Sequence, residues 1–171
     1  MKTSAKEYLT LGHKRLEIGA WALVALTLAL AVYGGCTVKG SFPTHYGVDG
    51  QANSYGSAWI LLLYPVLGAL VLGILSLVAH GVSPETWNLP FSLREERKAP
   101  VFRDMLTMIF LLEGEIAAMF LAATVLALLR NGTATLVLTL LFLAAATWTL
   151  IHWCRKAARD NRAEGETGRL T

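Results

Sequence analysis

The polar stretch 42–57 holds the side chains best suited to chemistry outside the apolar segments of the chain. The imidazole of His45 can change its charge near neutral pH or bind a metal, and Asp49, four residues later, is its nearest acidic partner. Tyr46, Asn53 and Tyr55 would complete a polar pocket around them. The residues predicted to bind a ligand or partner are Pro43, His45, Tyr46, Asp49, Gly50 and Tyr55.

A structural role for these residues is the alternative, because buried polar groups in a folded loop need hydrogen-bond partners. In that interpretation, His45 and Asp49 bond the loop's own backbone and hold its shape. The stretch contains no second His and no Cys, so a zinc site is not expected. The chain also has no Gly-rich phosphate loop, no Gly-x-Ser-x-Gly elbow and no His-Glu-x-x-His motif. We therefore predict no catalytic residue, no metal and no cofactor.

Glu113 and Glu115 are the second pair of candidates, because they lie inside a long apolar segment. Counted from Arg103 at ~1.5 Å per residue, they lie about 15 and 18 Å along a helix, near the middle of a bilayer. Each carboxylate would cost about 3 kcal/mol if it faced lipid. Two residues apart on a helix means about 200° of rotation, so they point to nearly opposite faces. Each acid is either functional or a protonated group bonded to a neighbouring helix, with Ser76 or Thr139 as partner.

The other His and Cys residues are predicted to have no chemical role. His80 and His152 lie at the inner ends of apolar segments, where a positive imidazole suits the helix dipole. His13 is expected on the surface. Cys36 and Cys154 fall on opposite sides of the bilayer in the topology derived below, and neither belongs to a metal-binding or redox spacing.

The composition predicts a membrane protein. Of 171 residues, 54% are hydrophobic and 16% charged, against about 45–50% and ~25% in soluble domains. The apolar residues form four blocks, each close to the ~20 residues that cross a bilayer. The predicted fold is therefore all-α, a polytopic membrane protein with four transmembrane helices. The predicted parts are a segment 1–17, a membrane domain 18–153 with helices at about 18–36, 58–79, 103–129 and 134–153, and a basic tail 154–171.

Local signals predict where some of these helices begin and bend. Ser57 is placed to cap the start of the second helix, and Pro65 predicts a kink within it because proline lacks a backbone donor. The pattern of residues 92–95 is that of a capping box, which predicts a short charged helix over 92–99. Pro100 then ends that helix or starts the next one.

The basic residues predict the orientation of the helices. If the N-terminus is inside, only Lys39 and Arg130 of the 15 Lys and Arg residues fall in outer segments. Cytoplasmic segments of membrane proteins carry the excess of basic residues. Both termini are therefore predicted to be cytoplasmic, and the stretch 42–57 to be a structured extracytoplasmic loop between the first two helices.

The loop also resembles a known family. The chain has Phe42-Pro43-Thr44-His45-Tyr46-Gly47, then Asp49-Gly50, then Tyr55-Gly56-Ser57 leading directly into an apolar helix. This pattern, over residues 40–62, resembles the domain of unknown function that forms the N-terminal part of the SdpI-like bacterial immunity proteins. The segment at Asn88-Leu89-Pro90 extends the likeness loosely over residues 15–125. Full-length proteins of that type carry a further membrane module, where this chain has a single additional span.

The resemblance implies a protein of the bacterial cytoplasmic membrane that senses an extracytoplasmic peptide, or gives immunity to it, and signals inward. The expected partners are membrane lipid, such a peptide, a cytoplasmic regulator and a second copy of the chain. Nucleic acid is not expected, because the basic residues form no stripe with interleaved aromatics. The alternatives are a small proton-coupled transporter that uses Glu113 and Glu115, a membrane-embedded enzyme at His45 and Asp49, or an accessory subunit.

Overall fold

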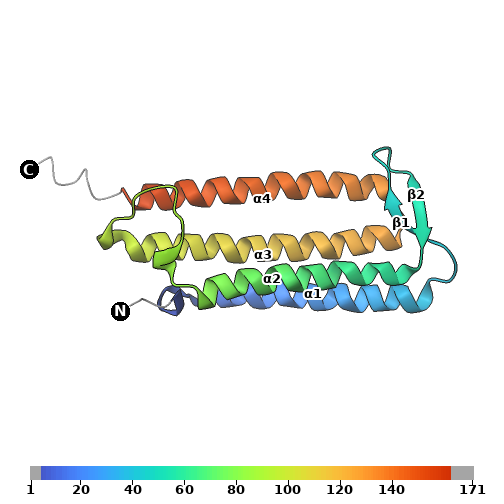
Figure 1. Ribbon diagram of the computed structural model, residues 1–171, viewed down its shortest axis with the longest axis horizontal. Helices are drawn as coiled ribbons and strands as arrows, with labels where there is room; N and C mark the ends of the chain where they lie inside the picture. Colours follow the sequence, from blue (N-terminus) through green and yellow to red (C-terminus); the bar gives the residue numbers. More distant parts are fainter. Residues whose placement is uncertain (1–4, 163–171) are drawn as a thin grey trace, which may run out of the picture.

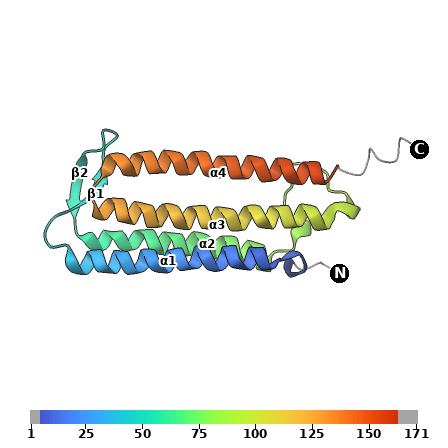
Figure 2. The same ribbon diagram turned by 180° about the vertical axis from the view of Figure 1, so that it is seen from behind.

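The computed structural model describes residues 5–162 as four long helices that lie side by side, with a β-hairpin across one end (Figures 1 and 2). The helices are α1 (Leu11–Thr37), α2 (Leu63–Gly81), α3 (Lys98–Leu128) and α4 (Gly132–Asp160). The strands are β1 (Phe42–Tyr46) and β2 (Ala52–Gly56). Four short 3-10 helices complete the described chain: η1 (Ala5–Tyr8), η2 (Ala58–Leu62), η3 (Pro84–Thr86) and η4 (Glu95–Arg97).

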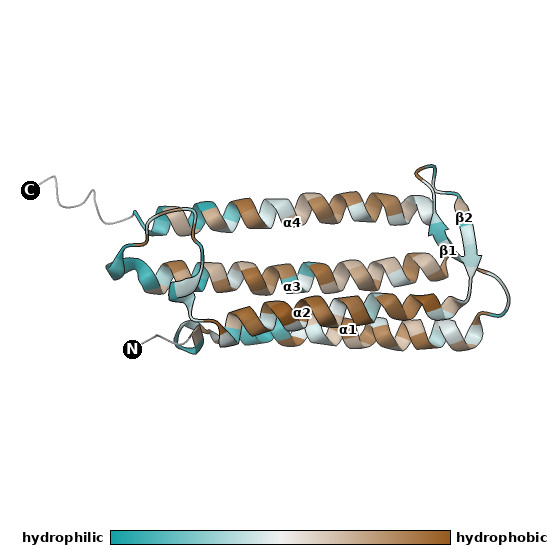
Figure 3. Ribbon diagram, in the orientation of Figure 1, coloured by the Kyte–Doolittle hydropathy of each residue, from teal (hydrophilic) through white to brown (hydrophobic). Residues whose placement is uncertain are grey.

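All four long helices are long and apolar enough to cross a membrane, so the prediction of four membrane-length helices is confirmed. The middle of the bundle is mostly hydrophobic, and hydrophilic residues concentrate where α1 begins and α4 ends (Figure 3). We call that end of the bundle the termini end and the opposite end the hairpin end. The architecture is that of a multi-pass membrane protein.

The first and last helices, α1 and α4, extend beyond the apolar blocks predicted for them. α1 begins at Leu11, well before residue 18, because Thr10 and His13 form a reciprocal capping box at its start. α4 continues to Asp160 through part of the predicted tail 154–171. Residues 1–4 and 163–171 of the two predicted end segments lie outside the described residues.

Ser57 caps the second membrane segment as predicted, since its hydroxyl accepts a hydrogen bond from the backbone N–H of Trp59. The segment begins as the 3-10 helix η2 and becomes α-helical only at Leu63. Pro65 lies just after this change and has no N–H to donate to the carbonyl of Leu61. The backbone hydrogen bond that Pro65 lacks therefore lies at the start of α2, not in the middle of the helix where a kink was predicted.

The prediction of a capped helix over 92–99 is wrong. Residues 92–94 are not helical, η4 has no side-chain cap, and Pro100 lies in the first turn of α3. The amide of Asn161 instead holds this segment: its Oδ1 accepts from the N–H of Arg94 at 3.0 Å, and its Nδ2 donates to the carbonyl of Ser92 at 2.9 Å. A contact from the end of α4, distant in sequence, thus replaces the local cap.

The hairpin departs from the predicted all-α class. β1 and β2 pair antiparallel, with irregular register around His45. The chain reverses at Asp49-Gly50, where Gly50 has a φ of +77° that glycine tolerates best. The N–H of Gly47 donates to the carbonyl of Gln51 at 2.8 Å and closes the turn. These turn residues convert the predicted loop into a short sheet.

The hairpin is anchored on the helices by buried apolar residues. Phe42 is 1% exposed and packs in a cluster drawn from α1, η2 and α3, which contains Ala31, Ala58, Leu61 and Ala127. At the start of α4, Gly132 lies directly against the ring of Tyr46 and the carbonyl of Gly50. Both ends of β1 are therefore fixed to the bundle.

α3 is the central helix, since it packs against α1, α2 and α4, whereas α4 packs chiefly on α3. Small residues allow the close approach of the helices: Ala20 and Ala117 are buried beside Leu72 where α1, α2 and α3 meet. Much of α4 faces outward with large apolar side chains such as Leu140, Leu141 and Leu143.

Gly132→Ala is expected to destabilise the protein by about 1–3 kcal/mol, because an added methyl group would overlap Tyr46 and Gly50 and displace the hairpin. The measurement is the unfolding midpoint of the protein in detergent. Gly73→Ala on α2 is the matched control, because a methyl group there meets no atom within 4 Å. Equal midpoints for the two variants would contradict the docking of the hairpin on α4.

Candidate functional site

His45 is exposed and bonds across the hairpin. Its Nδ1 lies 2.6 Å from Oδ1 of Asn53 on β2. The predicted partner, Asp49, does not contact it. The acceptor oxygen of Asn53 requires Nδ1 to carry the proton in this hydrogen bond, and Nε2 has no hydrogen-bond partner among the described residues.

Asp49 and Gly50 shape the turn. Oδ1 of Asp49 accepts a hydrogen bond from the backbone N–H of Gln51 at 3.0 Å, as aspartates commonly do at turns. Gly50 packs directly against Thr133 at the start of α4. Asp49 therefore bonds the backbone of its own turn, and the turn docks on α4.

The other predicted binding residues divide into anchors and exposed groups. Pro43 is buried, and Tyr46 is half-buried with its hydroxyl lacking a hydrogen-bond partner among the described residues. Burial raises the pKa of Tyr46, so the phenol stays protonated at neutral pH. Tyr55 is 59% exposed. Of the six residues, His45, Asp49 and Tyr55 are exposed, and Asn53 is exposed beside His45.

The described residues, 5–162, hold no group of three or more His, Cys, Asp or Glu side chains arranged to bind a metal ion. Cys36 is exposed, Cys154 is half-buried, and both are free thiols.

Glu113 is fully buried and faces α2. Its Oε1 accepts a hydrogen bond from the hydroxyl of Ser76 at 3.0 Å, which is one of the two partners that the sequence suggested. Its Oε2 is buried without a hydrogen-bond partner in the described part of the chain. A buried carboxyl oxygen left in this way is energetically unfavourable.

Glu115 faces the opposite side of α3, as the helical rotation predicted. Its Oε1 accepts a hydrogen bond from the hydroxyl of Thr149 on α4 at 2.5 Å. Thr139, the other partner considered, instead donates to the carbonyl of Thr135 in its own helix. Oε2 of Glu115 is also buried without a partner in the described chain. The two acids therefore link α3 to different helices.

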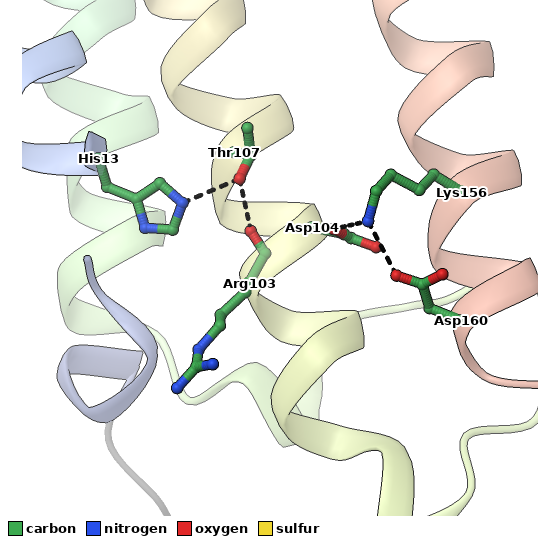
Figure 4. Close-up of polar contacts among 6 residues, drawn as sticks. All are labelled: His13, Arg103, Asp104, Thr107, Lys156 and Asp160. Atoms are coloured by element: carbon green, nitrogen blue, oxygen red, sulfur yellow. Dashed lines mark hydrogen bonds and ion pairs between the residues drawn. The ribbon is translucent and has the colours of Figure 1, made fainter. Parts of the chain in front are cut away.

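His13 is buried, at 4% exposed, so its expected place on the surface is wrong. Its ring points from α1 to Thr107 on α3, with Nε2 2.9 Å from the hydroxyl (Figure 4). That hydroxyl donates to the carbonyl of Arg103, so Nε2 of His13 must be the donor to it. The Nδ1 atom accepts from the N–H of Thr10 at 3.2 Å. Because one ring nitrogen donates and the other accepts, the imidazole of His13 in this arrangement is neutral.

His80 has a partner that the sequence analysis missed. Its Nε2 lies 3.0 and 3.1 Å from the two carboxylate oxygens of Glu17 on α1. Both ring contacts of Phe110 on α3 are with histidines: it stacks on His13 at 5.6 Å and meets His80 edge-on at 5.9 Å. These side chains gather in the half of the bundle nearer the termini end. We call them the interior polar cluster: His13, Glu17, Ser76, His80, Thr107 and Glu113.

Spacing in the sequence could have indicated this cluster. His13 and Glu17 are four residues apart on α1, and Ser76 and His80 are four apart on α2. Residues at that spacing lie on one face of a helix. Each of these two apolar helices therefore has a polar pair on one face, close to its polar end.

A separate charged group joins α3 and α4 at the termini end. Nζ of Lys156 lies 2.6 Å from Oδ1 of the buried Asp104 and 2.8 Å from Oδ2 of Asp160 (Figure 4). Ala157, next to Lys156 in the chain, and Phe102, two residues before Asp104, belong to one buried apolar cluster. The ion pair therefore adjoins this cluster. It fixes the end of α4 to α3.

Comparisons of the chain with protein-family models, curated proteins and solved structures found no match. The geometry of the hairpin and of the interior polar cluster is therefore the basis for the functional inferences below.

Thr149→Val is expected to weaken α3–α4 packing by about 0.6–2 kcal/mol, because it leaves Glu115 without its interhelical hydrogen bond. The unfolding midpoint in detergent measures the effect. Thr139→Val removes a hydroxyl from the same helix that bonds only its own backbone, and should change the midpoint little. A larger loss for Thr139→Val than for Thr149→Val would contradict the assigned role of Glu115.

Proposed function

We propose that this protein belongs to the bacterial cytoplasmic membrane, resembles the SdpI-like proteins, and recognises an extracytoplasmic peptide through its hairpin. The main support for this proposal is that some side chains of the hairpin are buried against the bundle while others are exposed. Phe42 and Pro43 are buried against the bundle, whereas His45, Asn53 and Tyr55 are exposed. A rigidly held polar edge outside the apolar region is suited to recognition.

Strand addition is the proposed mode of binding. β2 is largely exposed along its length, and no backbone hydrogen bond joins it to a described segment other than β1. An exposed strand edge offers unpaired N–H and C=O groups to an extended peptide, and side chains beside the edge supply specificity. His45, Asn53 and Tyr55 provide one free ring nitrogen, an amide and an aromatic ring for that purpose.

The proposed orientation places the hairpin outside and the termini end in the cytoplasm. Lys39 and Arg130 are the basic residues near the hairpin end, and the positive-inside rule assigns the other end to the cytoplasm. On this basis the expected partners are lipid around the bundle, a peptide at the hairpin and a regulator at the termini end.

α4 supplies a physical connection for inward signalling. Its first residue, Gly132, contacts Tyr46 and Gly50 of the hairpin, and Asn161 at its far end holds the backbone of Ser92 and Arg94. α4 packs chiefly on α3 and is bonded to it through Thr149 and Lys156, so a shift of α4 would carry α3 with it. A displacement of the hairpin by a bound peptide would move segment 92–97 through α4.

Expression of the wild-type gene is expected to protect a sensitive bacterium from at least one member of a panel of secreted killing peptides. The double substitution His45→Ala, Asn53→Ala should abolish protection at matched expression, because it removes the exposed polar pair proposed to contact the peptide. Survival as a function of peptide concentration is the measurement.

The matched control is Thr44→Val, Ser54→Ala, which removes the other cross-strand side-chain pair of the same hairpin. This variant should keep protection. Equal protection by both double variants would exclude recognition through His45 and Asn53. Absence of protection by the wild type against every peptide would remove the immunity function itself.

A further inference from the structure

We propose that Glu113 is a proton-binding site inside the membrane domain, and that it exchanges its proton with the aqueous phase at the termini end through His80 and Glu17. This role goes beyond peptide recognition and does not depend on it. It supplies the step that the alternative prediction of a proton-coupled transporter would need.

Glu113 has the features of a site that can change its protonation state. The side chain is fully buried, one oxygen accepts from Ser76, and the other has no hydrogen-bond partner in the described chain. A single hydrogen bond to Ser76 leaves half of the carboxyl group unpaired, and a protonated acid is the form that such a buried site tolerates best. An intramembrane acid with an unused oxygen is a functional candidate by default.

The route from Glu113 leads along α2. Ser76 and His80 are one helical turn apart on α2, so the imidazole lies about 6 Å nearer the termini end than the hydroxyl that binds Glu113. His80 and Glu17 are in direct contact, and their side chains are 32% and 21% exposed. The chain of groups therefore runs from a fully buried acid to a partly exposed pair nearer the termini end.

The ionisable groups near Glu113 come from α1, α2 and α3. Glu17 on α1 is the described charged group whose field acts on Glu113. On α2 the facing titratable group is His80, and on α1 the other is His13, which its two hydrogen bonds hold neutral. On α3 itself, Glu115 points away to α4. A proton that leaves Glu113 thus moves toward an anionic carboxylate.

The transfer balances without any other reactant. The O–H bond of Glu113 breaks, and the carboxylate keeps the electron pair. The proton forms an N–H bond at Nδ1 of His80, while Nε2 of the same ring passes its proton to the carboxylate of Glu17. One bridging water or one rotamer change of His80 spans the single turn between the groups. Uptake follows the same steps in reverse.

Infrared spectroscopy of the whole protein in phospholipid vesicles tests the site directly. The wild type should show the carbonyl band of a buried protonated carboxylic acid. Glu113→Gln should remove one component of this band, and Glu115→Gln, the matched control on the opposite face of α3, should leave that component in place. An unchanged band in Glu113→Gln would overturn the proposal.

The route is tested by the rate at which the same band shifts after transfer to D₂O. His80→Phe should slow the shift by at least about tenfold, because a positioned proton-transfer group typically contributes a factor of about 10²–10⁴. His152→Phe is the control, since His152 lies near the same end on α4 and stacks on Trp148 instead. A wild-type rate in His80→Phe would overturn the route.

If Glu113→Gln fails to fold, Ser76→Ala provides the test, because it keeps the carboxyl group and removes one hydrogen bond to it. The acid band should then move to a higher wavenumber, and an unmoved band would overturn the assignment. These spectra report on buried carboxyl groups of α3 and not on the hairpin, so none of the outcomes affects the hairpin proposal.

Discussion

The need to satisfy two carboxyl groups in the middle of one apolar helix determines how this bundle is arranged. Glu113 and Glu115 point to opposite sides of α3, so α3 must have a polar partner on each side. Ser76 on α2 meets the first and Thr149 on α4 the second. α3 is consequently the one long helix that packs on all the others. The position of α4 outside the cluster of α1, α2 and α3 follows from the same requirement.

The sequence alone predicted the parts of this arrangement that depend on one helix. Composition and block length indicated four membrane helices, helical rotation separated the two acids, and Ser57 was identified as a cap. The choice of Thr149 over Thr139 depends on the axial register of α4 against α3, which no local pattern specifies. The burial of His13 likewise depends on which helix faces it. The hairpin was predicted only as a loop with a turn, because its strands are short and rich in polar residues.

The hairpin and the interior polar cluster lie at different depths and use different chemistry. The hairpin presents exposed hydrogen-bonding side chains on a fixed backbone, which suits recognition of another chain. The cluster consists of acids, imidazoles and hydroxyls within an apolar bundle, which suits the movement of charge. α1 and α3 contribute to both, since Ala31 and Ala127 pack beneath the hairpin and Glu17 and Glu113 lie lower in the same helices.

The bond between Glu115 and Thr149 also has a consequence for how the protein is made. Ribosomes deliver α2 before α3 and α4 after it, so Ser76 is already in the membrane when Glu113 arrives, whereas Thr149 is still to come. When α3 enters the bilayer, Glu113 therefore has its hydrogen-bond partner available, whereas Glu115 does not. The unpaired acid has a transient cost of about 3 kcal/mol on insertion scales. Until α4 is synthesised, Glu115 lacks its hydrogen-bond partner, so α3 reaches its final hydrogen bonding only when the last helix has joined the bundle.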